Sequence, residues 1–162
     1  ASVVFMIPLG IGFATTVRVG FFTGAGHAAA ARHAGLVGMA MGTGNAAFNA
    51  TLMLVFGGLI ARLYTSDVGI AAQAVAFLGL AAVFQLADGL QATANGALRG
   101  LKDTRIPMLI TLTSYWLIGL PVAWWLCFHT PLQANGLWWG LTAGLAAAAI
   151  GLTLRFQRLT RR

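Results

Sequence analysis

Residues 68–98 read VGIAAQAVAFLGLAAVFQLADGLQATANGAL, and this stretch decides the fold class. It is longer than the roughly 20 residues that a helix needs to cross a bilayer, and its only charged residue is Asp88. The rest of the chain is similar, since 59% of the 162 residues are hydrophobic and 8% are charged. Soluble domains carry roughly one-quarter charged residues. We therefore expect an all-α, polytopic transmembrane helix bundle.

Working outward with the same length criterion, we find five apolar spans joined by short links that contain Gly, Pro, Asn and Asp. They form a single expected transmembrane bundle over residues 1–162, without a soluble domain and with a cytoplasmic tail at 155–162. The chain opens in an apolar run that lacks the basic segment of a signal peptide, so we expect a fragment without its upstream part. The expected spans are 2–24, 35–60, 68–98, 107–129 and 136–154.

The basic residues gather on one side of the expected bundle. Nine of the ten lysines and arginines flank the first link, the third link or the tail, and only Arg62 falls on the other side. The positive-inside rule then places the C-terminus in the cytoplasm. Because these residues form no stripe interleaved with aromatic rings, we expect no nucleic-acid partner. The nine are Arg18, Arg32, Arg99, Lys102, Arg105, Arg155, Arg158, Arg161 and Arg162.

Asp88 is the most informative residue, because it lies in the middle of an apolar span. A carboxylate at lipid depth is costly, and it normally faces the bundle interior or water at a functional site. Polar and aromatic neighbours recur along the same helical face, a mixture that suits an amphipathic organic cation. We also assign Tyr115, in the fourth span, to the cavity. The other candidates to line it are Gln85, Gln91, Asn95, Phe84 and Phe77.

An alternative interpretation is that the amide side chains only join helices by interhelical hydrogen bonds. It applies less well to the ionisable Asp88 and better to Asn45 and Asn49, for which we favour it. Pro8 and Pro121 lie inside spans, where a missing backbone donor kinks a helix. We take both prolines as candidate hinges, together with Gly10 and Gly12.

Several classes of site are not expected. The three histidines, His27, His33 and His129, lack the helical spacing of a metal site and are read as solvated residues in or near the links. A single cysteine, Cys127, allows no intramolecular disulfide. We find no phosphate-binding glycine loop, nucleophile elbow or paired carboxylates, so the sequence predicts neither an enzyme nor a resident metal or cofactor.

Three stretches taken together resemble bacterial transporters of the MATE (multidrug and toxin extrusion) family, NorM type. They are ATTVRVGFFTGAG at 14–26, FQLADGLQATANGALRGLKDTRIP at 84–107 and YWLIGLP at 115–121. The resemblance implies two six-helix lobes around a cavity that opens alternately to either side. The five spans would be helices eight to twelve, so the first lobe and helix seven would be missing. It also implies that Asp88 couples transport to sodium or protons.

From this resemblance we expect secondary active efflux of cationic or amphipathic drugs across a bacterial cytoplasmic (inner) membrane, with the fragment alone inactive. Sodium or a proton would be the coupling ion, and no cofactor is implied. A lipid-linked oligosaccharide flippase of the same superfamily is an alternative, against which the lack of lysine or arginine at membrane depth weighs. The second alternative is a non-transporting membrane subunit or a gene remnant. Replacing Asp88 by Asn would distinguish these, because only the antiporter needs the charge.

Overall fold

The computed structural model describes residues 2–64, 68–130 and 134–161, and every regular element in these ranges is a helix. The expected all-α bundle is thus confirmed. A π-helix, η1, joins two α-helices of the fourth span end to end. The elements are α1 (Ser2–Gly24), α2 (Ala28–Tyr64), α3 (Val68–Gly100), α4 (Arg105–Thr113), η1 (Ser114–Gly119), α5 (Leu120–His129) and α6 (Ala134–Thr160).

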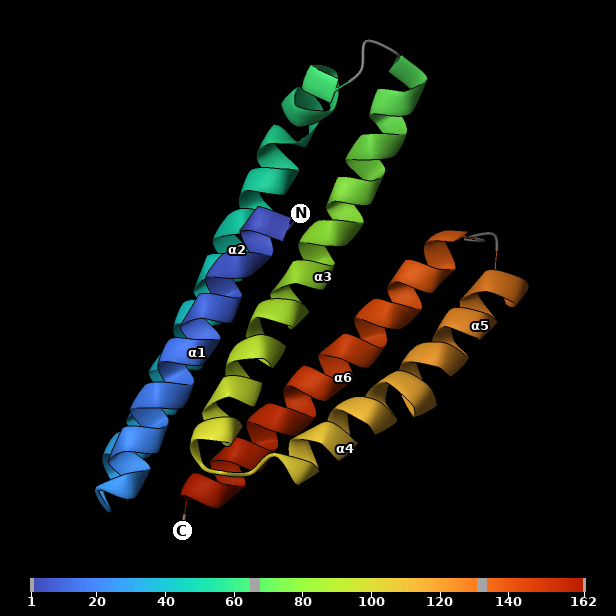
Figure 1. Ribbon diagram of the computed structural model, residues 1–162. Coiled ribbons are helices and arrows are strands. Elements are labelled where there is room, and N and C mark those ends of the chain that lie inside the picture. Colours follow the sequence, from blue (N-terminus) through green and yellow to red (C-terminus); the bar gives the residue numbers. More distant parts are fainter. Residues whose placement is uncertain (1, 65–67, 131–133, 162) are drawn as a thin grey trace.

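Helix α3 is the centre of the bundle, because it contacts α1, α2 and α6, while α6 packs in turn against η1 and α5 (Figure 1). The α1–α2 link, the α3–α4 link and the C-terminus gather at one end of the molecule (Figure 1). Nine of the ten basic residues lie in or close to these three places in the sequence. The helices therefore alternate in direction as the charge count requires.

Four segments of the described chain are long and apolar enough to cross a membrane: Met6–Gly24, Ala74–Gly100, Arg105–His129 and Asn135–Thr160. Helix α2 is not among them. It nevertheless covers the whole predicted span 35–60. That this helix crosses the membrane stays a prediction, while the multi-pass character of the chain is clear from the other four.

Large apolar side chains lie on the outer faces of the helices, as a lipid-embedded bundle allows. Val17, Phe21, Leu117 and Phe128 are each at least 70% exposed. The buried core is small and lies where α1, α2, α3 and α6 meet. It comprises Val19, Ala31, Met39, Ala94, Ala97, Leu98, Leu152 and Phe156.

Helix α6 continues to Thr160, through most of the predicted tail at 155–162, and Phe156 is fully buried; the cytoplasmic location of this tail stays a prediction. The Phe156 ring packs on Gly35, where any larger side chain would overlap it. Arg155 forms an ion pair with Asp103 of the α3–α4 link, with 3.0 Å between Nε and Oδ2. The end of α6 is therefore part of the bundle.

The predicted links are also too long. Helix α2 begins at Ala28, so Arg32 and His33 lie in its first turns and not in the link. Only three residues join α1 to α2, and among them Gly26 adopts a φ of 77°, which favours glycine. The second predicted link, Ala61–Asp67, falls partly outside the described residues.

Candidate functional site: the polar face of α3

The predicted polar stripe lies on one helix, α3, and its four members are all half-buried: Gln85, Asp88, Gln91 and Asn95. Gln91 and Asn95 line a groove of about 150 Å³ against Gly12 and Thr16 of α1. On its other side the stripe is bounded by α6, because the Phe84 ring meets Trp138 edge-on with 6.2 Å between the ring centroids. The stripe thus lies on a face of α3 between α1 and α6.

Asp88 has no hydrogen bond or ion pair within the described part of the chain. The same is true of Gln85, Gln91 and Asn95 among these residues. Among the described residues, these four side chains thus form none of the interhelical hydrogen bonds of the alternative interpretation. A half-buried carboxylate without a protein partner is instead available to an ion, a proton or a ligand.

The amide pair in α2 behaves differently. Asn49 Nδ2 donates to the backbone carbonyl of Asn45 at 3.0 Å and to its side-chain oxygen at 3.1 Å. Both bonds remain within α2, so within the described residues the expected interhelical bonds of this pair are not found. The two amides satisfy each other because they are four residues apart on one helix.

Tyr115 is the one predicted cavity residue that comes from outside α3 yet approaches the stripe. It lies half-buried in η1, close enough to Asp88 for the carboxylate charge to act on its hydroxyl group. Phe77 is 46% exposed, and its part in the cavity stays a prediction. Among the predicted cavity residues, the structure thus places Tyr115 within the electrostatic reach of Asp88, with Phe84 at the edge of the stripe.

The π-helix that holds Tyr115 coincides with one predicted break. The backbone N–H of Leu120 donates to the carbonyl of Tyr115, five residues back, which defines the wider turn. Pro121 follows at once and lacks the N–H that a regular helix would direct at Leu117. The proline signal in the sequence thus marks a change in helical register next to the stripe.

The other hinge candidates lie in α1. Pro8 is buried inside this continuous helix. A Cβ placed on Gly12 would lie 3.2 Å from the carbonyl oxygen of Ala92, whereas one placed on Gly10 would meet nothing within 4 Å. Close packing against α3 is therefore enough to explain Gly12. Hinge motion at these residues stays a prediction.

Two residues near the stripe were missed. Thr16 Oγ1 donates across the helix interface to the carbonyl of Gly96 at 2.8 Å and also to Gly12 at 2.9 Å. Arg99, assigned to a link from the sequence, lies in the last turn of α3 and lines the groove beside Asn95. Arg99 is four residues from Asn95 and therefore continues the polar face. This spacing could have predicted its position from the sequence.

Comparisons with known proteins show the family of this chain. The family model described as MatE matches residues 1–125, which is most of the chain. The chain belongs to the MatE family. The resemblance that the three sequence stretches carry is thereby confirmed.

Relatives of this MatE chain are considerably longer than it. It is 47% identical to a "Probable multidrug resistance protein NorM" of Burkholderia pseudomallei, over 98% of this chain and 35% of that protein. It is also 47% identical to the "Multidrug resistance protein PmpM" of Pseudomonas aeruginosa, over 100% and 35%. The chain thus spans about a third of the length of these curated relatives.

A solved structure has the same fold. It is described as the inward-facing conformation of a multidrug resistance MATE family transporter of the MOP superfamily. The TM-score is 0.83 over 98% of this chain and 38% of that one, at 19% sequence identity. The five-helix arrangement in Figure 1 is therefore a part of a MATE transporter fold.

Proposed function

We propose that this chain forms the part of a secondary active multidrug exporter that carries its cation-coupling carboxylate, Asp88. The exporter would exchange cationic or amphipathic organic compounds for sodium or protons across a bacterial cytoplasmic membrane. The observation that carries the proposal is the position of Asp88, half-buried at mid-span and without a partner in the described chain. The names of the relatives, which are multidrug resistance proteins, support multidrug efflux.

The coupling follows from general thermodynamics. A cation that binds Asp88, or a proton that neutralises it, lowers the free energy needed to keep this face of α3 away from water. If the cation and the drug stabilise different access states, each one drives the release of the other. The opposite wall of such a cavity would come from the two-thirds of a typical relative that this chain does not span. Alone, the chain would not transport.

The test is ethidium efflux from cells that express the protein at the full length its gene encodes. We compare native protein with Asp88→Asn and Asp88→Glu at matched membrane abundance. We expect Asp88→Asn to abolish efflux and Asp88→Glu to retain part of it, because only the latter keeps the charge.

Asp103→Asn is the matched control, because it removes a carboxylate that pairs with Arg155 at the end of the bundle, away from mid-span. It should retain efflux once abundance is matched. Unchanged efflux in Asp88→Asn would remove this residue from the mechanism. If the native protein itself fails to export the dye, the flippase and the non-transporting subunit become the better interpretations.

A further inference from the structure

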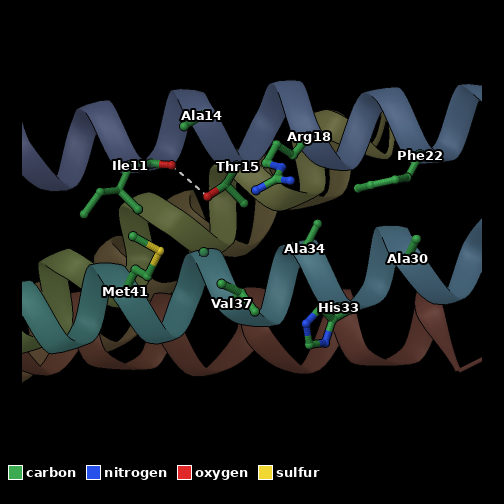
Figure 2. Close-up of a pocket in the computed structure, with 11 residues that line it drawn as sticks. Ile11, Ala14, Thr15, Arg18, Phe22, Ala30, His33, Ala34, Val37 and Met41 are labelled. Carbon is green, nitrogen blue, oxygen red and sulfur yellow. Dashed lines mark hydrogen bonds between the residues drawn. The ribbon is translucent and has the colours of Figure 1, made fainter.

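A second and larger groove lies between α1 and α2, with a volume of about 450 Å³ (Figure 2). No residue of α3 lines it, so it is separate from the polar face. At the end of the groove away from Arg18, Ile11 of α1 and Met41 of α2 extend toward each other near Val37 (Figure 2). This part of the groove therefore offers an apolar surface.

The other end of this groove is cationic. Arg18 extends from α1 toward α2 (Figure 2), and His33 of α2 also lines the groove, with its ring on the side of α2 away from α1 in this view. An adjoining hollow of about 480 Å³ shares His33 and adds Arg32 of α2 and Arg161 beyond the end of α6. No acidic residue is found among the described residues that line either hollow. This end of the groove, which we call its mouth, thus gathers the positive charges of Arg18, Arg32 and Arg161. It lies at the end of the bundle that carries most of the basic residues.

We propose that this groove binds one anionic phospholipid, with its phosphate at Arg18 and one acyl chain along Ile11, Val37 and Met41. Arginine recognises phosphate through charge-assisted, often bidentate hydrogen bonds. Arg18 lies six residues before the end of α1 at Gly24, or about 9 Å along the axis. A side chain at that depth extends toward the headgroup region while its stem stays in the apolar layer.

Charge complementarity selects this occupant over a transported compound. The drugs of the proposed function are cationic or amphipathic, and a mouth of arginines repels a cation. A zwitterionic lipid offers the same phosphate but no net charge, so it gains less from the field of Arg18, Arg32 and Arg161. The lipid site does not rest on the proposed function, because it uses a different groove and a different charge.

The test is native mass spectrometry of the protein at its encoded length, purified in detergent and supplied with equal amounts of phosphatidylglycerol and phosphatidylcholine. We expect one phosphatidylglycerol to remain bound in preference. Arg18→Gln should weaken its binding about fivefold, whereas Arg18→Lys should keep most of it. Val37→Trp, which fills the apolar part, should reduce binding of both lipids. Arg105→Gln is the matched control, because Arg105 is exposed on α4 at the same end, outside the groove.

Three results would overturn the proposal. Equal retention of the two lipids would mean that charge does not select the ligand. Equal weakening by Arg18→Gln and Arg105→Gln would indicate a diffuse attraction of the whole surface. Displacement of phosphatidylglycerol by millimolar inorganic phosphate, with Val37→Trp still binding normally, would make this a free-phosphate site. If Arg18→Gln does not purify as a monodisperse species, Arg32→Gln and Val37→Trp provide the same comparisons.

Discussion

Tyr115 and Asp88 come from parts of the chain that are separated by the whole α3–α4 turn, yet the carboxylate charge reaches the phenol. Asp88 has no other polar partner in the described chain. No hydrogen bond joins the two groups in the described chain, but a phenol hydroxyl that reached the charged carboxylate in another access state would form a bond worth about 1.5–3 kcal/mol. Tyr115 is therefore placed to tune how readily Asp88 holds its charge.

We accordingly expect Tyr115→Phe to lower ion-driven drug transport about tenfold, a factor that corresponds to the weaker end of that range. Drug binding should change little, because the ring remains. Transport by reconstituted full-length protein under an imposed ion gradient measures the effect. Trp116→Phe is the control, because Trp116 is the neighbouring residue and is 64% exposed. Equal transport by Tyr115→Phe and native protein would show that the hydroxyl group plays no part.

At the residue scale, the sequence was sufficient to place the stripe on α3, because helical periodicity alone fixes which residues share a face. It was not sufficient to show which side chains are engaged in hydrogen bonds. Thr16 bonds to a backbone carbonyl that the close approach of two helices brings within reach, and such an approach depends on packing. Phe77 belongs to the same periodic set, yet 46% of it is exposed in this chain, whereas the four polar residues are half-buried.

Among the elements, the crossing of α1 and α3 holds the groove beside the stripe. The two backbones come so close that a Cβ on Gly96 would overlap the carbonyl oxygen of Gly12, and one on Gly100 would lie 2.8 Å from that of Thr16. Small residues allow helices to approach this closely in a membrane. There, van der Waals packing drives helix association, because lipid tails are as apolar as the helices. The hydrogen bond from the Thr16 hydroxyl to the carbonyl of Gly96 further stabilises the contact between α1 and α3.

Gly96→Ala should therefore destabilise the full-length protein by about 1–3 kcal/mol, the usual cost of overpacking, although alanine is the better helix former. Gly44→Ala is the matched control, because a Cβ there meets no atom of this chain within 4 Å, and it should leave stability unchanged or raise it. Thermal unfolding in detergent gives the comparison. A Gly96→Ala protein as stable as the native one would contradict the close crossing.

The existence of the helices followed from apolar length, but their ends did not. Helix α2 has 37 residues and includes Arg32 and His33. The sequence did not predict its beginning, because polar residues occur both in links and in helix ends and hydropathy does not distinguish the two. The π-helix is a further case. Pro121 predicted a break, but whether a proline produces a kink or a wider turn depends on how the neighbouring α6 packs against η1.

For the whole molecule, the direction of insertion is the property to test. Nine of the ten basic residues predict one cytoplasmic end, and the structure brings the three basic segments to the same end (Figure 1). In a Cys127→Ser background, Arg158→Cys should react with an impermeant maleimide only after the cells are opened. His129→Cys, at the opposite end, should react in intact cells. Both positions are exposed, so the reverse pattern would mean the opposite orientation.

The most direct test of the central claim measures drug uptake into proteoliposomes that contain the full-length protein, under an imposed sodium gradient or an imposed pH gradient. Native protein should accumulate the drug against its gradient with one of the two ions. Asp88→Asn should lose this accumulation with both ions while it still binds the drug, because the carboxylate is the coupling group. Undiminished accumulation by Asp88→Asn would contradict the account.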